Sequence, residues 1–143
     1  MVRASLLHEI KRLDIDIFQA INRRYKKMNL ELTPMHAKIL LHLASSDKKL
    51  CQKDLENLIL CNKSTLSSII STMEKNKLVT RETSKQDSRI NYLLLTDRGM
   101  EMIDFLKKDK KVIEDNLNEG ITEEEYQTFL KIVDKMKKNM ERI

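Results

Sequence analysis

The chain has 143 residues, of which 41% are hydrophobic and 34% charged, a balance typical of a folded domain and not of a disordered tail. It contains 2 Gly, 1 Pro and no Trp, which argues against glycine-rich loops and against sites built on aromatic stacking. No apolar run approaches the roughly 20 residues that span a bilayer. Because the first residues turn polar too soon for a secretory signal, we expect a cytoplasmic protein without a membrane segment.

The charge is basic and unevenly distributed. The chain carries 27 Lys and Arg against 22 Asp and Glu, a formal net charge of +5. Residues 1–99 hold 18 basic and 11 acidic side chains, whereas residues 100–143 hold 9 and 11. A basic excess favours a nucleic acid or an anionic surface as partner. We therefore expect such a partner to meet the first two thirds of the chain.

The first predicted element is a long amphipathic helix over residues 3–28. A helix of this length exceeds what a small core covers by itself, so we expect it to seek a partner helix. Its apolar side chains recur at steps of three and four residues: Leu6, Ile10, Leu13, Ile17 and Ile21.

Two shorter helices are predicted next. Thr33 is a good N-cap, and Pro34 suits the first helical position, where its missing N–H costs nothing. This second helix should end near Ser45, and a third, short helix is expected over residues 51–60.

The fourth predicted helix has two chemically different faces. Asn62 is a good N-cap, and the helix should run to about Lys75. One face is apolar and the other is rich in short hydroxyl side chains. The apolar face consists of Leu66, Ile69, Ile70 and Met73.

The hydrophobic period then changes from helical to β. Residues 78–82 and 90–95 are β-prone, and the polar residues 83–89 between them predict a hairpin with a long, partly basic tip. Thr96 and Asp97 should start a fifth helix that runs to about residue 118. After a break at Gly120, the capping-box pair Thr122 and Glu125 starts the last helix.

The order helix, short turn, helix, hairpin predicts a winged helix-turn-helix. The expected fold class is mostly α with a small β-hairpin wing. A helix fits the major groove of DNA, hydroxyl side chains suit phosphates and base edges, and a basic wing suits the adjacent minor groove. The candidate DNA-binding residues are Asn62, Lys63, Ser64, Thr65, Ser67, Ser68, Thr72, Lys85 and Arg89.

Over nearly its whole length the sequence resembles the MarR family of multiple-antibiotic-resistance-type regulators. The resemblance depends on short motifs in the family's order and at near-gapless spacing. These motifs are Leu32-Thr33-Pro34, Gln52-Lys53-Asp54-Leu55, Lys63-Ser64-Thr65-Leu66, Met73-Glu74-Lys75, Leu78-Val79, Asp87-Ser88-Arg89 and Leu95-Thr96-Asp97-Arg98-Gly99.

The resemblance implies roles for two wing residues. Arg89 matches the wing-tip arginine that enters the minor groove, and Asp87 matches the wing aspartate that orients an arginine. The chain also departs from the family pattern. Ser68 stands where the recognition helix commonly has Arg, Leu60 and Lys77 stand where Gly is common, and Cys51 replaces a Ser or Thr N-cap.

The resemblance also implies the organisation and function of the whole chain. Residues 1–143 would form a single MarR-like domain, with residues 33–98 as the DNA-reading head and residues 1–30 and 99–143 as the dimerisation region. The protein would be a homodimeric transcriptional regulator, in particular a repressor, on a pseudo-palindromic operator in double-stranded DNA. A small phenolic or aromatic ligand would act as effector and release the DNA.

Two alternatives remain open, an oxidant sensor of the same fold that uses Cys51 or Cys61 and a winged-helix module that binds protein. The two cysteines match no C-x2-C zinc spacing. His8, His36 and His42 form no i, i+3 or i, i+4 ligand pair, although His36 is a candidate to line a small-molecule pocket. With no catalytic motif in view, we expect no enzyme, no metal site and no cofactor.

Overall fold

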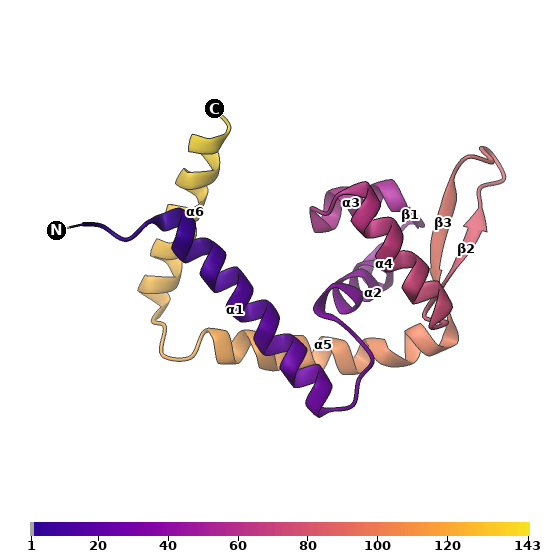
Figure 1. The fold of residues 1–143 in the computed structure, drawn as a ribbon, viewed down its shortest axis with the longest axis horizontal. Helices are drawn as coiled ribbons and strands as arrows, with labels where there is room; N and C mark the ends of the chain where they lie inside the picture. Colours follow the sequence, from indigo (N-terminus) through magenta and orange to yellow (C-terminus); the bar gives the residue numbers. More distant parts are fainter. Residues whose placement is uncertain (1) are drawn as a thin grey trace. The chain divides into compact units, whose positions relative to one another are not determined.

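A computed structural model describes residues 2–143, which form six helices and one small sheet (Figure 1). The chain divides into two compact units, an N-terminal unit up to Asp109 and a C-terminal unit from Lys110 to Ile143. The elements are α1 (Leu6–Lys27), α2 (Pro34–Ser45), β1 (Leu50–Cys51), α3 (Gln52–Ile59), α4 (Lys63–Lys75), β2 (Val79–Thr83), β3 (Asn91–Leu95), α5 (Asp97–Leu117) and α6 (Glu123–Met140). The predicted mostly α fold with a hairpin wing is confirmed.

The helix starts follow from capping side chains. Thr33 Oγ1 accepts the His36 N–H at 3.2 Å, and His36 Nδ1 accepts the Thr33 N–H in return. The Oδ1 atom of Asn62 accepts the Thr65 N–H at 2.9 Å, and Thr122 and Glu125 form the expected capping box. Each cap satisfies N–H groups that have no partner inside their own helix.

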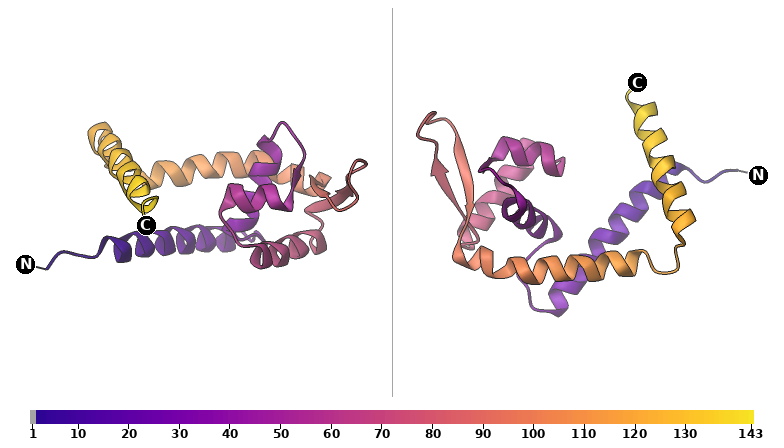
Figure 2. Two further views of the ribbon diagram at one scale, coloured as in Figure 1. Left: turned by 90° about the horizontal axis from the view of Figure 1, so that it is seen from above. Right: turned by 180° about the vertical axis from the view of Figure 1, so that it is seen from behind.

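The sheet has three antiparallel strands in the order β1-β3-β2. In the hairpin, Val79 pairs with Leu95 and Thr83 with Asn91. The strand β1 was not predicted, because Cys51 lies at the start of the segment expected to be helical and Leu50 directly precedes it. The helix α3 therefore begins one residue later, at Gln52. Both views of Figure 2 show the hairpin tip projecting away from the helices of the N-terminal unit.

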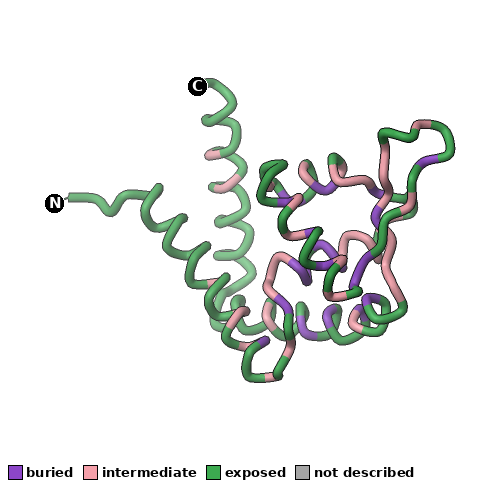
Figure 3. The backbone as a smooth tube through the Cα atoms, turned by 45° about the vertical axis from the view of Figure 1, so that its right-hand side comes forward, coloured by how far each residue is buried: buried purple, intermediate pink, exposed green. Residues whose placement is uncertain are grey.

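The core lies among the elements of the N-terminal unit. The most deeply buried residues, drawn in purple in Figure 3, are supplied by α2, α3, α4 and α5. The largest of the fully buried side chains are Ile39, Leu40, Leu55, Leu66, Ile70, Met73 and Leu106. In the C-terminal unit, by contrast, every residue is exposed or only half-buried.

An ion pair between residues distant in sequence joins α1 to α5 inside the N-terminal unit. Both Nε and a terminal nitrogen of Arg24 donate to Asp109 Oδ1, at 2.8 and 2.6 Å. Asp109 is only 4% exposed, and its Oδ2 atom is buried with no hydrogen-bond partner among residues 2–143. Arg24 is therefore the counter-charge of this buried carboxylate.

Two left-handed residues bracket α4. Leu60, which ends α3, has φ 53°, and Lys77, which follows α4, has φ 61°. These are the two positions where glycine is common in the family pattern. The turns before and after α4 thus keep a left-handed backbone although both residues carry a Cβ, a conformation that is costly for L-residues.

Candidate nucleic-acid interface

The α4 helix separates a buried face from an exposed face, as its sequence predicts. Leu66, Ile70 and Met73 are fully buried against the core. The opposite face carries most of the candidate DNA-binding side chains in exposed positions. These exposed residues are Asn62, Lys63, Ser64, Thr65, Ser68 and Thr72. A helix fixed by one face and polar on the other has the form required to enter a major groove.

The N-terminal end of α4 is held by Asn62. Its Oδ1 atom accepts both the Thr65 N–H and the Ser64 hydroxyl, the latter at 3.1 Å. At the other end of the exposed face, the Thr72 hydroxyl donates to the Ser68 carbonyl at 3.2 Å. Several of the candidate hydroxyls therefore already have one hydrogen bond within the protein.

Gln52, which the sequence analysis did not select, connects α3 to α4. Its Nε2 atom donates to Ser67 Oγ at 2.7 Å and lies 3.3 Å from the Lys63 carbonyl oxygen. Ser67 is half-buried beneath this contact, so it is less open than the other candidate serines. Only the folded structure brings residues 52 and 67 together, although Gln52 lies within one of the family motifs.

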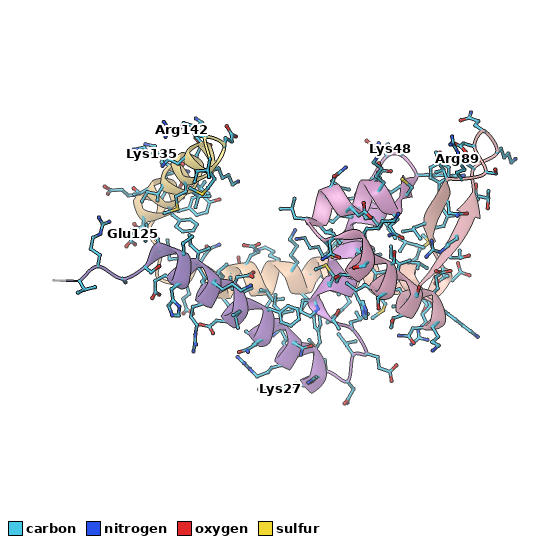
Figure 4. All side chains as sticks on the ribbon, turned by 45° about the horizontal axis from the view of Figure 1, so that its top comes forward. Lys27, Lys48, Arg89, Glu125, Lys135 and Arg142 are labelled. Atoms are coloured by element: carbon cyan, nitrogen blue, oxygen red, sulfur yellow. The ribbon has the colours of Figure 1, made fainter. Side chains whose placement is uncertain are left out.

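At the wing, Asp87 and Arg89 form a two-pronged ion pair. The Nε and terminal nitrogens of Arg89 lie 3.0 Å from the two carboxylate oxygens of Asp87, and the Arg89 N–H also donates to that carboxylate. These hydrogen bonds from Arg89 lower the pKa of Asp87. The Arg89 side chain is still 88% exposed, at the tip of the wing in Figure 4. The carboxylate thus holds an exposed guanidinium in place.

The fold of the wing tip depends on Ser84, a buried residue that the sequence analysis also missed. Its Oγ atom accepts the N–H groups of Gln86 and Asp87, and its own N–H donates to the Ile90 carbonyl at 2.9 Å. This network closes the tip and holds the backbone of Asp87, the ion-pair partner of Arg89. Lys85 lies exposed on the same loop.

Acidic side chains partly neutralise the base of the wing. Arg81 pairs with Glu74 of α4 at 2.7 Å, and Lys49 pairs with Glu82 of β2 at 2.6 Å. Within residues 2–143, neither Lys63 nor Lys85 takes part in an ion pair. The uncompensated positive charge of the candidate interface therefore lies at the start of α4 and at the wing tip.

The cysteines and histidines have structural contacts. Both the backbone N–H and the thiol of Cys51 lie within hydrogen-bond distance of Asp54 Oδ2, at 3.0 and 3.3 Å, and Cys61 packs against the core. His36 caps α2 in a buried position, and this burial lowers its pKa. Over the described part of the chain, no three His, Cys, Asp or Glu residues gather in a way that could hold a metal ion.

Both the sequence and the fold of this chain are similar to those of known proteins. Residues 30–90 match a sequence model described as the MarR family. The chain is 25% identical over 104 residues to the uncharacterized HTH-type transcriptional regulator YdgJ of Bacillus subtilis (strain 168). This alignment covers 73% of the chain and 63% of YdgJ, so the chain matches less than two thirds of that relative.

Solved structures share the fold over almost the whole chain. The MepR–DNA complex of S. aureus superposes with a TM-score of 0.87 at 20% identity, covering 96% of this chain and 99% of that one. The apo (heme-free) form of PefR gives a TM-score of 0.71 at 28% identity, covering 94% and 99%. Of these proteins, YdgJ is described as a transcriptional regulator, and MepR was solved in complex with DNA. Among residues 2–143, no helix is long and apolar enough to cross a membrane.

Proposed function

From the match of residues 30–90 to the MarR family and from the shared fold, we propose that the chain is a regulator of this family, a sequence-specific transcriptional regulator that binds double-stranded DNA. The observation that carries this proposal is the pairing of an exposed, hydroxyl-rich α4 face with an exposed arginine held at the wing tip. In this role α4 lies in the major groove, and Arg89 enters the adjacent minor groove, where the negative potential attracts it. Lys63 and Lys85 contact phosphates.

The active form is a homodimer. Long amphipathic helices at both ends of the chain leave large apolar side chains exposed, and monomeric proteins rarely leave contiguous patches of this kind uncovered. On α1 these are Leu6, Leu7, Ile10, Leu13, Ile15 and Phe18, and on α6 they include Tyr126, Phe129 and Leu130. Two copies would present two α4 helices to a pseudo-palindromic operator with half-sites roughly 34–36 Å apart.

The regulatory effect is repression, relieved by a small phenolic or aromatic ligand. This part of the proposal depends on the family resemblance. The ligand would act by binding more tightly to a dimer whose two heads do not fit the operator. A panel of phenolic compounds, tested by thermal shift and by release of bound DNA, checks it. A panel that changes neither readout would contradict it.

A thiol-based sensor is less well supported by the surroundings of the cysteines. The Cys51 thiol lies 3.3 Å from the Asp54 carboxylate, whereas reactive thiolates are typical of electropositive sites. We therefore expect the Cys51→Ser and Cys61→Ser double variant to bind and release DNA as the wild type does, with or without peroxide. Peroxide-dependent release that the double variant lacks would favour the oxidant-sensing alternative.

The test of the main proposal is selection of bound sequences from random duplex DNA. We expect a two-fold symmetric site, and an affinity that falls steeply with salt because lysines and arginines displace counterions. Arg89→Ala should weaken binding between about fivefold and a hundredfold, the range for an arginine inserted into a groove. Arg142→Ala, at the far end of the sequence and also exposed, is the matched control. Binding that no salt concentration changes, or an unaltered Kd for Arg89→Ala, would refute the assignment.

A further inference from the structure

We propose that hydrogen bonds inside the protein give two serines of α4 opposite polarities toward DNA. Ser67 presents a hydrogen-bond donor to the base edges, and Ser64 presents an acceptor. Gln52 is the positioning residue that sets the polarity of Ser67. This inference rests on the proposed DNA-binding function and states which bases the helix selects.

The orientation of the Gln52 amide is determined by its second partner. The atom near Ser67 Oγ also lies 3.3 Å from the Lys63 carbonyl oxygen, which can only accept a hydrogen bond. An amide oxygen at this place would face the carbonyl without a proton between them, so the atom is Nε2. It follows that Gln52 donates to Ser67 Oγ at 2.7 Å and that Ser67 accepts.

This contact leaves the Ser67 hydroxyl hydrogen without use inside the protein. Among residues 2–143, the Ser67 hydroxyl donates to no acceptor. The Lys63 carbonyl oxygen, one turn earlier in α4, accepts a hydrogen bond from Gln52 and none from the Ser67 hydroxyl. A buried or half-buried hydroxyl is most stable when its hydrogen finds an acceptor. On the DNA-facing helix, that acceptor is a base edge.

Ser64 has the opposite arrangement, and its polarity is determined in the same way. The Asn62 atom that it contacts also accepts the Thr65 backbone N–H, which can only donate, so this atom is the oxygen Oδ1. The Ser64 hydroxyl therefore donates to Asn62, and its lone pairs point to other partners. Ser64 is exposed and can accept a hydrogen bond from DNA.

The two polarities select different bases in the major groove. Acceptors there are guanine O6 and N7, adenine N7 and thymine O4, whereas cytosine offers only its amino donor. Ser67 keeps one free lone pair, but accepting from the cytosine amino group would leave the Ser67 hydroxyl hydrogen without an acceptor, so cytosine is disfavoured at the position it faces. Ser64 as an acceptor favours adenine or cytosine, the bases with amino groups in that groove. Neither preference would follow from a serine whose hydroxyl rotates freely.

The experiment compares full-length wild type with Gln52→Met and Ser67→Ala in selections from random duplex DNA, followed by Kd measurements on matched duplexes. We expect wild type to disfavour cytosine about fivefold at one position of each half-site, the selectivity of a single hydrogen bond. Ser67→Ala should lose this preference at that position alone. Gln52→Met, which keeps the side-chain length but lets the hydroxyl rotate, should admit cytosine there. Ser64→Ala should lose a preference for adenine or cytosine at a different position.

Two further variants keep the result interpretable. Ser67→Thr retains the hydroxyl and should keep the preference that Ser67→Ala loses, and Gln127→Met, the same exchange on α6, should keep the wild-type selection. A Gln52→Met protein with wild-type preference, alongside a changed Ser67→Ala, would overturn the role of Gln52. A loss of affinity in Ser67→Ala that is equal for all sequences would indicate a phosphate contact and overturn the base assignment. A wild type that selects no sequence would instead refute the proposed function itself.

Discussion

The helices α4 and α6 have the same kind of sequence pattern and opposite surroundings. Both carry apolar side chains at helical spacing along one side. In α4 the side chains of Leu66, Ile70 and Met73 are fully buried, whereas Phe129 of α6 is 56% exposed. Periodicity thus predicts a helix and its apolar face, but it does not tell which chain covers that face.

The contrast indicates where each unit obtains its stability. The N-terminal unit closes its core with its own residues, from α2, α3, α4 and the sheet. The C-terminal unit has no buried residue with which to hold α6 in place. We therefore expect the first unit to be stable within one chain and α6 to depend on the second copy in the proposed dimer.

The largest expected effect comes from truncating one apolar side chain in each helix. Ile70→Ala leaves a cavity in a closed core, so it should lower the free energy of unfolding by about 2–5 kcal/mol at any protein concentration. Phe129→Ala should instead raise the dissociation constant of the dimer and make the melting temperature depend more strongly on concentration. Chemical denaturation at two protein concentrations and analytical ultracentrifugation separate the two outcomes.

If Phe129→Ala destabilised the chain by the same amount at every concentration, α6 would be packed within its own subunit. The proposed difference, in which α4 is covered by its own chain and α6 by a second copy, would then be contradicted. Gln127→Ala, on the same helix but polar, is the control for a change of helix propensity.

The next effect concerns the ion pair between α1 and α5. Arg24→Ala leaves the buried Asp109 carboxylate without its counter-charge, and breaking a buried pair in this way generally costs about 3 kcal/mol or more. Since water can reach the partly exposed Arg24 side, we expect the lower end of that range. The double variant Arg24→Met with Asp109→Leu should recover most of the loss in thermal denaturation. A double variant no more stable than Arg24→Ala would show that the helices need the charges themselves.

A smaller effect should follow a change of pH. His36 caps α2 as a neutral ring, and burial lowers its pKa below the ordinary value of about 6.5. The unfolded chain therefore binds the proton more readily, so stability is complete above about pH 6.5 and is lost as the pH falls below it. The loss for one group is at most about 1.4 kcal/mol per pH unit.

His36→Gln keeps a side-chain acceptor for the Thr33 N–H and removes the titration. The difference in melting temperature between pH 7.5 and pH 5.5 should therefore be smaller in this variant than in wild type. An equal difference in both proteins would assign the pH dependence to other groups. His8→Gln, which changes an exposed histidine on α1, is the matched control.

Local chemistry in the sequence was sufficient to predict most elements. Thr33, Asn62 and Thr122 were expected as N-caps, and each makes the predicted hydrogen bond to a backbone N–H. The hairpin was predicted because its two β-prone segments are close in the sequence and share one polar connection. The strand β1 escaped prediction because two residues are too few to display a period of two.

The residues missed at the candidate interface act through three-dimensional contacts. The Arg89 position could be selected from its charge and from the family motif. The roles of Gln52 and Ser84 could not, because a glutamine or a serine in a polar segment has no distinctive pattern. Likewise, Arg24 and Asp109 are 85 positions apart, and only the packing of α1 on α5 brings them together.

The left-handed backbone at Leu60 and Lys77 offers two positions where a substitution should raise the free energy of unfolding of this protein. For an L-residue that conformation costs about 1–2 kcal/mol. Glycine adopts it freely, but it also raises the conformational entropy of the unfolded chain, which lowers stability. Exchanging Leu60, which is 89% exposed, for glycine removes no buried contact and should leave a net gain below about 1 kcal/mol. Glycine at Lys77 should act in the same direction, so a more heat-resistant variant can be built without altering any side chain assigned to DNA recognition.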